Sequence, residues 1–498
     1  MEKDTQELFC TGLPTKPTPE NGKVLVTGAT GYIGGRLVQE LLARGYGVRT
    51  MLRAPVPGNE ERWPGSEVAV ADASNPPALR AALNGIHTAY YLIHSLLLGP
   101  LEFEAVDAAY ARNFREAAEA AGVRRIIYLG GLGDVRAVLS PHLRSRMQVA
   151  EELQRGTIPT TVLRAAIIIG SGSASYEIVH HLVRNVPVIP VPPWGRTKCQ
   201  PIAVRDVIRY LVGTLESPAT AGASYDVGGS DVLTYELMLR ILADVLGKRR
   251  FFVPVPAFLS HVGFYAYCAG LLTPVPAPII ASLMESLRND VVCQDTRIRD
   301  IIPFTPATYR EAVVDAMSRE EQDEIHSRWT DAYPLAHELA MKLQEVKPPP
   351  AYVATYSLLT DKNAAALFRS ICRIGGKEGW FRGNWLWRLR GALDRMLMGV
   401  GSARGRRSSR SLRVNDVIDF WRVEEIIPSR RLLLRAEMLL PGRAWLEFRI
   451  DADAGKNRLG VTAHYDTHTI VGRIYWYIFL PFHWYLFVNL LKQIDKRS

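Results

Sequence analysis

The chain has 498 residues, of which 48% are hydrophobic and 22% are charged, and its formal net charge is +10. A chain of this length exceeds one ordinary hydrophobic core, so we expect two domains. The composition is that of a folded globular protein and argues against extended disorder. The positive charge suits an anionic membrane surface or a phosphorylated ligand. Nucleic acid is not expected as a partner, because zinc-finger and RNA-binding motifs are missing from the sequence.

The five cysteines are scattered and form no CxxC pair, which argues against a disulfide framework, and no metal site is expected. The first ten residues include acidic side chains and lack an apolar signal core. We therefore expect a cytoplasmic protein, with peripheral membrane contact as an open alternative. Two uncharged stretches, Phe251–Met284 and Ile474–Leu491, are interrupted by prolines or polar residues. They favour buried or surface-dipping segments over membrane-spanning helices.

Residues 1–20 are polar and are expected to form a flexible tail. From Lys23 onward, short apolar segments alternate with amphipathic ones. Strands are expected at 24–26, 48–52, 68–70, 89–93, 126–129 and 161–163, and helices at about 31–44 and 103–121. This alternation predicts a doubly wound parallel sheet, an α/β Rossmann-type domain. We assign it to residues 21–320, with the apolar Phe251–Met284 region as a cap over the substrate side.

Residues 321–350 are interpreted as a helical linker that ends in the stiff run Lys347-Pro348-Pro349-Pro350. Beyond it, strand candidates follow one another without intervening helices, separated by turn-forming residues. These candidates are 417–426, 431–439, 444–450 and 459–465, and a long aromatic helix follows from about Val471 to Ile494. In Ala444–Ile450 the even-numbered residues are apolar, while Glu447 and Arg449 point the other way, so one face of the sheet is expected to be buried. An antiparallel sheet wrapped on a helix predicts an α+β, helix-grip-like domain over residues 351–498. Such a domain can enclose a pocket for a small apolar molecule.

A glycine-rich segment connects the first strand to the first helix. Glycine permits the tight turn and lets the backbone approach a pyrophosphate at the positive N-terminus of the helix. The strand before it, the helix after it and the second strand about 20 residues later all agree with a dinucleotide site. The expected cofactor-binding residues here are Gly28, Thr30, Gly31, Tyr32, Ile33 and Gly34.

The end of the second strand distinguishes NAD(H) from NADP(H). An NAD(H) site places an acidic residue there for the ribose 2′-hydroxyl, whereas this chain has Arg53, which can pair with a 2′-phosphate. NADP(H) is therefore favoured over NAD(H), with Arg49 as a second possible donor. Asp72 is placed to accept from the adenine amino group, or else to help cap a helix. His94 ends the fourth strand, where backbone flanks the cofactor.

Several segments together resemble a known family. VLVTGATGYIGGRLV (24–38), VRTMLR (48–53), YYLIHS (90–95), IIYLGGLG (126–133) and QPIAVRDV (200–207) are similar to the atypical short-chain dehydrogenase/reductases and their NmrA-like relatives. The second half resembles the domain of unknown function that some bacterial proteins carry after such a domain, in GSARGRRSSRSLRVNDVIDFWRVEEI (401–426) and PGRAWLEFRI (441–450). The resemblance implies NAD(P) binding and an oxidoreductase, and leaves the substrate open.

The chain departs from the catalytic pattern of the wider superfamily. Active members use Tyr-x-x-x-Lys, in which the tyrosine moves the proton and the lysine holds the ribose. Here His142-Leu143-Arg144-Ser145-Arg146 stands in its place, so His142 and Arg146 are the candidate catalytic residues. Tyr176, in a Gly/Ser loop after another strand, is an alternative proton donor. The alternative for His142 is a cap of the helix that begins after Ser140-Pro141, and the alternative for Tyr176 is a packed tyrosine in a loop.

Three functions remain open on this evidence. The first is an NADP(H)-dependent oxidoreductase or isomerase that acts on an apolar carbonyl-type substrate. The second is a non-catalytic NADP(H) sensor, which the missing Tyr and Lys would suit. The third is a lipid-binding or membrane-surface module, in which the aromatic helix and the arginine-rich stretch from Arg404 to Arg413 would meet lipid headgroups.

Overall fold

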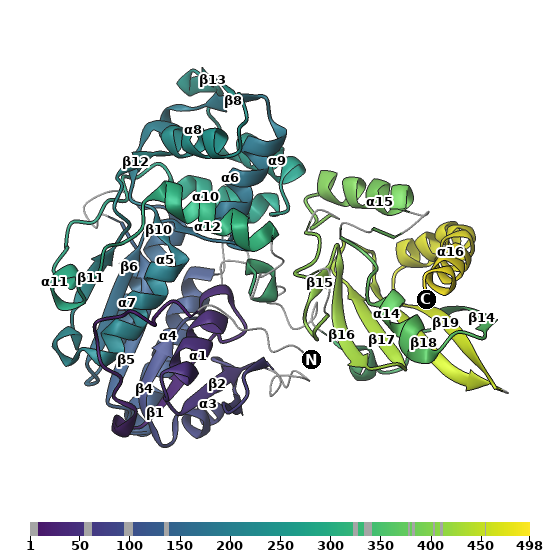
Figure 1. The fold of residues 1–498 in the computed structure, drawn as a ribbon, viewed down its shortest axis with the longest axis horizontal. Coiled ribbons are helices and arrows are strands. Elements are labelled where there is room, and N and C mark those ends of the chain that lie inside the picture. Colours follow the sequence, from purple (N-terminus) through teal and green to yellow (C-terminus); the bar gives the residue numbers. More distant parts are fainter. Residues whose placement is uncertain are drawn as a thin grey trace. The chain divides into compact units, whose positions relative to one another are not determined.

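The structure is a computed structural model of the chain. It describes residues 8–53, 62–93, 103–133, 139–321, 327–332, 341–376, 379–380, 384–401, 404–408, 412–453 and 455–498. The chain divides into two compact units (Figure 1). The first comprises Met1–Leu272 and Ala277–Tyr333, and the second comprises Thr273–Pro276 and Pro334–Ser498.

The first unit is built on a seven-stranded parallel sheet in the order β11-β6-β5-β4-β1-β2-β3. The strands are β1 (Lys23–Val26), β2 (Val48–Leu52), β3 (Glu67–Val70), β4 (Ile86–Tyr91), β5 (Arg125–Gly131), β6 (Thr160–Ala165) and β11 (Ser224–Val227). The strand order changes direction between β1 and β4, which creates the crevice where ligands bind in open α/β sheets. The predicted doubly wound Rossmann fold is confirmed.

Helices cover both faces of this sheet. One core contains side chains of α1 and α7, and the opposite core contains side chains of α3, α4 and α5. Val24 and Val26 point into the first core and Leu25 into the second, and all three are buried. This is why the strand is continuously apolar. The helices are α1 (Tyr32–Ala43), α3 (Pro76–Leu83), α4 (Phe103–Ala120), α5 (Pro141–Gln154), α6 (Ala174–Asn185), α7 (Val204–Glu216), α8 (Tyr235–Val245), α11 (Ile298–Ile301) and α12 (Tyr309–Glu321).

The structure corrects the expectation of a flexible tail for residues 8–20, the part of that segment that it describes. Phe9, Cys10 and Leu13 are buried in the core beside α1. The backbone amides of Phe9 and Cys10 donate to the Glu40 carboxylate at 2.6 and 3.2 Å. A buried carboxylate needs donors, and here the amino-terminal segment supplies them. Burial is also the main cause that raises the pKa of Glu40.

The apolar Phe251–Met284 region forms several short elements that cap the sheet rather than one long helix. They are β13 (Phe251–Pro254), α9 (Val262–Leu272) and α10 (Ala277–Ser286), and β13 pairs with β8 (Val188–Val191). α9 packs on α10 and α6.

The remaining short strands are β7 (Ile168–Ile169), β9 (Lys198–Cys199), β10 (Ile202–Ala203) and β12 (Leu233–Thr234), and the 3-10 helices are η1 (Pro19–Asn21), η3 (Pro193–Arg196), η4 (Pro218–Thr220), η5 (Ala257–Leu259), η6 (Trp329–Ala332) and η7 (Leu343–Glu345).

The second unit has a six-stranded antiparallel sheet in the order β14-β19-β18-β17-β16-β15, which confirms the predicted meander (Figure 1). The strands are β14 (Tyr352–Thr360), β15 (Val417–Ile418), β16 (Trp421–Ile427), β17 (Arg431–Ala436), β18 (Arg443–Asp453) and β19 (Lys456–Asp466). The helices are α14 (Ala364–Ile371), α15 (Asn384–Met396) and α16 (Ile470–Lys496), and α16 packs on β14 and β19. Sequence analysis did not predict β14, α14 or α15.

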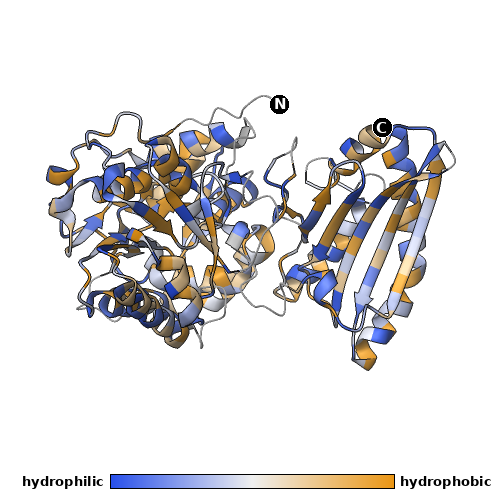
Figure 2. Cartoon of the chain, turned by 90° about the horizontal axis from the view of Figure 1, so that it is seen from below, coloured by the Kyte–Doolittle hydropathy of each residue, from blue (hydrophilic) through white to orange (hydrophobic). Residues whose placement is uncertain are grey.

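Hydrophobic and hydrophilic residues follow one another along the strands of this sheet (Figure 2). Leu446, Phe448 and Ile450 are buried, as the alternation predicted. Trp445 and Glu447 on the other face are also buried. The indole of Trp445 donates to the Glu424 carboxylate at 3.0 Å, and that carboxylate also accepts from the amide of Leu343 at 2.8 Å. The segment before β14 therefore covers part of the face that the sequence suggested was solvated.

The arginine-rich stretch is largely internal, which corrects the expectation that it meets lipid headgroups. The Arg404 guanidinium pairs with Glu437 at 2.7 Å, and that of Arg407 pairs with Asp416 at 2.9 Å. Arg406 donates to the carbonyls of Cys372 and Ile374. Buried guanidinium groups need such partners. Arg410 lies outside the described residues.

Asp419 gives the second unit a pH dependence with a defined sign. Its carboxylate accepts from the Trp380 indole at 2.8 Å, and burial raises its pKa to about 6. Because the folded state holds this proton more tightly than the unfolded state, its stabilising contribution is complete below about pH 4 and is lost as the pH rises through 6. Between about pH 5 and pH 7 the native chain should lose about 1.4 kcal/mol that Asp419→Asn does not lose. Urea unfolding of both chains measures this difference, and equal pH dependence would contradict it.

Candidate nucleotide and substrate site

The glycine-rich loop between β1 and α1 has no room for a side chain at two of its glycines. Gly28 has φ +60°, and a Cβ added there would lie 2.7 Å from the Leu92 carbonyl oxygen. A Cβ on Gly34 would lie 2.3 Å from the Gly28 carbonyl oxygen. The first and third glycines are therefore required by the close packing of the loop on β4 and on α1.

The N-terminus of α1 is open to a ligand. Gly31 is its N-cap, and among the described residues no side chain caps this helix or adds an acidic group to its first turn. Thr30, Gly31, Tyr32 and Ile33 are half-buried rather than packed away. Uncapped amides at the positive end of a helix form a site for phosphate oxygens. The loop thus fits the pyrophosphate of a dinucleotide.

A buried arginine, Arg36, ties the start of α1 to distant parts of the first unit. Its guanidinium donates to the carbonyls of Ser171 and Ser327 at 3.0 and 3.1 Å and lies 4.1 Å from the Tyr32 ring centroid. Burial lowers its pKa. Sequence analysis missed this residue, because Ser327 is remote in the sequence and nothing in the motif indicates the contact.

Arg53, Asp72 and Tyr110 lie close together at the carboxyl edge of the sheet. Arg53 is exposed at the end of β2. Burial raises the pKa of Tyr110, the charge of Asp72 raises it further and the charge of Arg53 lowers it. Asp72 accepts from the backbone amide of Ser74 at 2.8 Å, while Asn75 caps α3. Asp72 is therefore not the cap of that helix, and its charge acts on Tyr110 together with that of Arg53.

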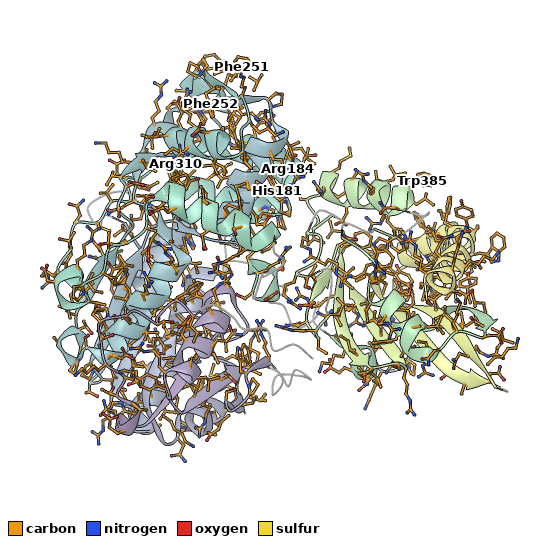
Figure 3. The ribbon with its side chains drawn as sticks, viewed as in Figure 1. His181, Arg184, Phe251, Phe252, Arg310 and Trp385 are labelled. Carbon is orange, nitrogen blue, oxygen red and sulfur yellow. The ribbon has the colours of Figure 1, made fainter. Side chains whose placement is uncertain are left out.

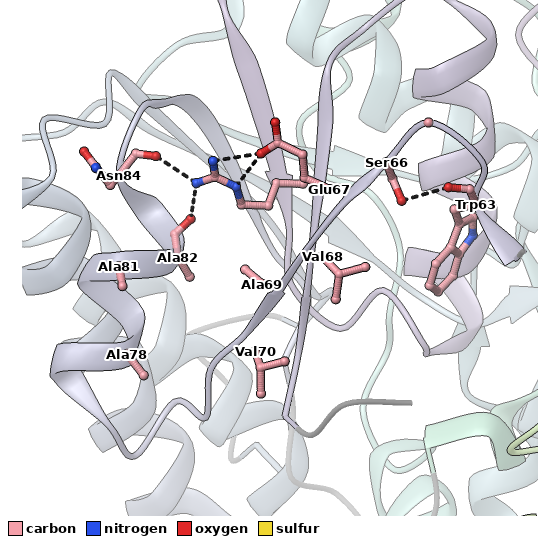
Figure 4. A pocket seen from close by; sticks show the side chains of 12 residues that line it. Trp63, Ser66, Glu67, Val68, Ala69, Val70, Ala78, Ala81, Ala82 and Asn84 are labelled. Atoms are coloured by element: carbon pink, nitrogen blue, oxygen red, sulfur yellow. Dashed lines mark hydrogen bonds and ion pairs between the residues drawn. The ribbon is translucent and has the colours of Figure 1, made fainter. Parts of the chain in front are cut away.

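Arg49, the second possible 2′-phosphate donor, is used elsewhere. It lies near the amino end of β2, where its guanidinium pairs with Glu67 at 2.8 Å and donates to the carbonyls of Ala82 and Asn84 (Figure 4). These contacts form one wall of a pocket at the β3 edge of the sheet. The structure thus corrects the assignment of Arg49 as a second donor to the 2′-phosphate. Arg49 lies near the amino end of β2, whereas the cofactor is expected at the carboxyl end of that strand. His94 lies outside the described residues.

A largely apolar cavity of about 490 Å³ lies within the first unit. Tyr32 and Ile33, in the first turn of α1, line it at one point, and the cap helices α9 and α10 line it at another. Its wall also includes the ends of β5 and β6, α5 and α6, and the β8 strand. The cavity therefore reaches from the glycine-rich loop to the cap. A pocket of this size and lining suits an apolar small molecule.

His142 and Arg146 both line this cavity, one turn apart on α5. Arg146 lies against the Gly130-Gly131 end of β5, since a Cβ on Gly131 would be 3.5 Å from its Cγ. Its guanidinium is 3.4 Å from the Tyr128 hydroxyl, which it contacts as a donor. The two residues that replace the Tyr-x-x-x-Lys pair are therefore brought together at the cavity wall.

The protonation of His142 limits its chemistry. Burial, with a smaller effect of the Arg146 charge, lowers its pKa to about 3. The imidazole is therefore neutral at physiological pH and can donate one hydrogen bond without acting as an imidazolium.

We predict that the His142 ring does not titrate between about pH 5 and pH 8, since its pKa of about 3 lies below that range. Nuclear magnetic resonance of histidine-labelled protein measures this, with His142→Gln identifying the signal. A midpoint near 6.5, the ordinary value for histidine, would contradict the prediction.

The structure corrects the expectation for Tyr176. Its side chain is fully buried in the core and its ring lies 5.2 Å from that of His180. It does not line the cavity, whereas Ser173 and Ser175 of the same loop do. Ser173 is the N-cap of α6 and accepts from the Tyr176 amide at 3.2 Å, which turns the tyrosine onto the buried face of the helix.

Several polar or aromatic residues of the cavity wall were not predicted. Trp194 and Tyr265 lie edge to face at 5.7 Å on the cap side. Trp329 reaches the wall because its amide donates to the Gly172 carbonyl at 2.9 Å. Tyr235 and Glu236, at the start of α8, complete the set. Only Trp194, within a proline-rich turn, had a local signal in the sequence. Among the described residues, no cluster of side chains could hold a metal ion.

Comparison with known proteins identifies the family. The NmrA-like family model matches residues 20–331, and a model described as a protein of unknown function, DUF2867, matches residues 348–489. The chain belongs to the NmrA-like family. It joins that domain to a DUF2867 domain, as the resemblance in the sequence implied.

Individual relatives of this NmrA-like chain include two reductases. Cinnamoyl-CoA reductase 1 of Oryza sativa subsp. japonica is 30% identical over 241 residues, which cover 44% of this chain and 68% of the relative. Ceramide reductase of Caulobacter vibrioides is 27% identical over 241 residues, which cover 48% and 75%. A solved structure of Citrobacter sp. triphenylmethane reductase complexed with NADP(H) has a TM-score of 0.48 and 20% identity, and covers 59% of this chain and 99% of its own.

Proposed function

We propose that this NmrA-like protein is an NADP(H)-dependent oxidoreductase that acts on an apolar carbonyl compound. The observation that carries the proposal is the cavity, whose wall includes the first turn of α1, the His142–Arg146 pair and the apolar cap. The reductases among its relatives support the reaction class.

NADPH is favoured over NADH because of Arg53. No acidic residue ends β2, and the exposed guanidinium at that position suits a 2′-phosphate. Gly28, Gly31 and Gly34 would hold the pyrophosphate at the start of α1, and Asp72 would accept from the adenine amino group. When bound, the reduced nicotinamide supplies a hydride to the carbonyl carbon.

The chain's own residues would polarise and orient the carbonyl. The Arg146 guanidinium would stabilise the negative charge that develops on the oxygen, as a fixed cation in an apolar cavity does effectively. Neutral His142 would donate its ring N–H to the same oxygen. The proton that completes the alcohol would come from solvent, because the pKa of His142 leaves no imidazolium to donate it.

The test is calorimetry with NADPH and NADH, followed by oxidation of NADPH in the presence of long-chain aldehydes and ketones. Native protein should bind NADPH and consume it, and Arg146→Leu should bind NADPH but turn over at least tenfold more slowly. If the native protein and Arg146→Leu both bound NADPH tightly and neither turned over any carbonyl compound, the result would instead favour the cofactor sensor. Absence of binding would overturn the proposal.

Peripheral membrane contact by the second unit is favoured by a separate observation. Among the described residues, α16 is the helix whose length and apolar composition would allow it to cross a membrane. Buried side chains such as Phe487 and Leu491 hold one face of it in the fold. The opposite face exposes apolar and aromatic side chains at helical spacing. They are Ile470, Ile474, Tyr477, Ile478, Phe482, Trp484 and Tyr485. A helix packed on one face and apolar on the other suits the plane of a membrane interface.

Replacing Ile478 and Trp484 of α16 by glutamate is expected to reduce binding to phosphatidylglycerol vesicles at least tenfold. Both side chains are more than half exposed, so the change should leave the fold intact. Co-sedimentation measures the effect, and a thermal melt checks folding. A pocket for a small molecule in the second unit, and a cytoplasmic location, stay predictions.

A further inference from the structure

In the β8–β13 ribbon, β8 lines the cavity with apolar side chains, and both strands also expose apolar side chains to solvent. In β8, Ile189 and Val191 are buried and line the cavity, while Val188, the first residue of the strand, is 50% exposed. β13 pairs with β8 through Phe251 opposite Val188, and Phe251 is 69% exposed (Figure 3). A strand at the surface of a globular protein normally alternates apolar with polar side chains. This ribbon does not.

The helices beside the ribbon repeat the pattern. In α9, Tyr265, Cys268 and Ala269 line the cavity, whereas Phe264 is 62% exposed. Phe258 in η5 is the most exposed large apolar side chain of the cap, at 84%. We call the exposed set the outer apolar patch, and it consists of Val188, Phe251, Val253, Phe258, Leu259 and Phe264. Monomeric soluble proteins seldom expose apolar side chains in such a group without a partner.

The charge around the outer apolar patch indicates what that partner is. Residues 178–205 and 245–284, which contain the patch, include no aspartate or glutamate. Three exposed cations border the start of the ribbon: Lys248 and Arg249 directly precede β13, and Arg184, labelled in Figure 3, lies in the last turn of α6. The Arg250 side chain joins the start of β13 to the end of α6, since its guanidinium donates to the carbonyls of Val183 and Arg184 at 2.6 and 2.9 Å. On α8, whose Arg240 lies over the Phe252 ring of β13, the carboxylates of Glu236 and Asp244 are paired with Arg240 and Arg310. The rim of the patch is therefore net positive, and an apolar surface with such a rim is complementary to an anionic bilayer.

We propose that the outer apolar patch docks the first unit on an anionic phospholipid bilayer, and that the cavity takes a long-chain, membrane-dissolved carbonyl compound through the cap. The substrate class rests on the proposed function, whereas the docking does not. The two roles are linked because β8 and α9 line the cavity on one side and carry residues of the outer apolar patch, Val188 and Phe264, on the other.

The docking test uses full-length protein in which Ile478→Glu and Trp484→Glu remove the α16 surface. Into this chain we would introduce Phe258→Glu and Phe264→Glu. Co-sedimentation with vesicles of phosphatidylcholine and phosphatidylglycerol should fall at least tenfold. The matched control is Leu237→Glu with Val314→Glu, two exposed apolar residues of the same unit outside the patch, which should bind as before. Lys248→Glu with Arg249→Glu should remove the preference for phosphatidylglycerol over phosphatidylcholine alone.

Two outcomes would overturn the docking. One is equal vesicle binding by the patch variant and its control. The other is loss of a protein dimer, measured by sedimentation, in the patch variant without any change in vesicle binding, which would assign the patch to a second copy of the chain. NADPH calorimetry on every variant verifies that the nucleotide site is intact. Failure of NADPH binding in the unmodified chain would overturn the proposed function while leaving the docking result standing.

The substrate class is tested by filling the cavity. Cys268→Phe should retain vesicle and NADPH binding but take up a fluorescent long-chain ketone from vesicles at least tenfold less than native protein. Because Cys268 lines the cavity from α9 and is not part of the patch, this variant separates the two roles. Unchanged uptake would overturn the assignment of the cavity as the lipid site.

Discussion

Gly34→Ala is expected to weaken NADPH binding at least a hundredfold. The added Cβ would lie 2.3 Å from the carbonyl oxygen and 2.8 Å from the carbonyl carbon of Gly28. Both are backbone atoms, so the loop itself must move away from α1. That movement removes the close approach of backbone amides to the pyrophosphate, which is the main source of affinity in this type of site. Calorimetry with NADPH measures the loss.

The control for this substitution is Gly12→Ala in the amino-terminal segment. A Cβ there meets no atom within 4 Å, and it should leave both affinity and thermal stability unchanged. Circular dichroism distinguishes a distorted loop from an unfolded chain. If Gly34→Ala bound NADPH as tightly as native protein, the glycine-rich loop could not be the pyrophosphate site.

Arg53→Ala is expected to weaken NADPH binding about 10- to 100-fold and to leave NADH binding nearly unchanged. A hydrogen bond to a charged group contributes about 1.5–3 kcal/mol, and 1.4 kcal/mol corresponds to tenfold in affinity. The effect should diminish in high salt, because Arg53 is exposed and its charge is screened. Titration of each variant with both cofactors gives the ratio of the two affinities.

Arg49→Ala is the matched control, because it removes an arginine from the same strand at its opposite end. Its guanidinium is held by Glu67 and by the carbonyls of Ala82 and Asn84. This variant should lose some stability at the edge of the sheet and keep the native preference for NADPH. An equal loss of NADPH and NADH affinity in Arg53→Ala would show that Arg53 supports the loop rather than the 2′-phosphate.

The local features of the first unit could be predicted from sequence because neighbouring residues determine them. The β1–loop–α1 unit depends on three glycines and an apolar strand within a few residues of one another, and the structure has it as expected. The meander of the second unit was equally local, since turn residues separate strands that pair with their neighbours. β14 was missed because its partner, β19, lies about a hundred residues later and no turn joins them.

The cavity and its polar wall were decided by tertiary structure. His142 and Arg146 were chosen by their position relative to β5, and their shared wall with Trp194, Tyr235 and Trp329 required contacts between distant segments. Tyr176 illustrates the limit of predicting site residues from sequence, because the N-cap at Ser173 sets which side of α6 the ring occupies. The sequence by itself thus determined the dinucleotide fold and the chemistry of its loop, because glycine conformation and strand periodicity are local. Only the packed chain decided which side chains face the substrate, since burial depends on residues far apart along the chain.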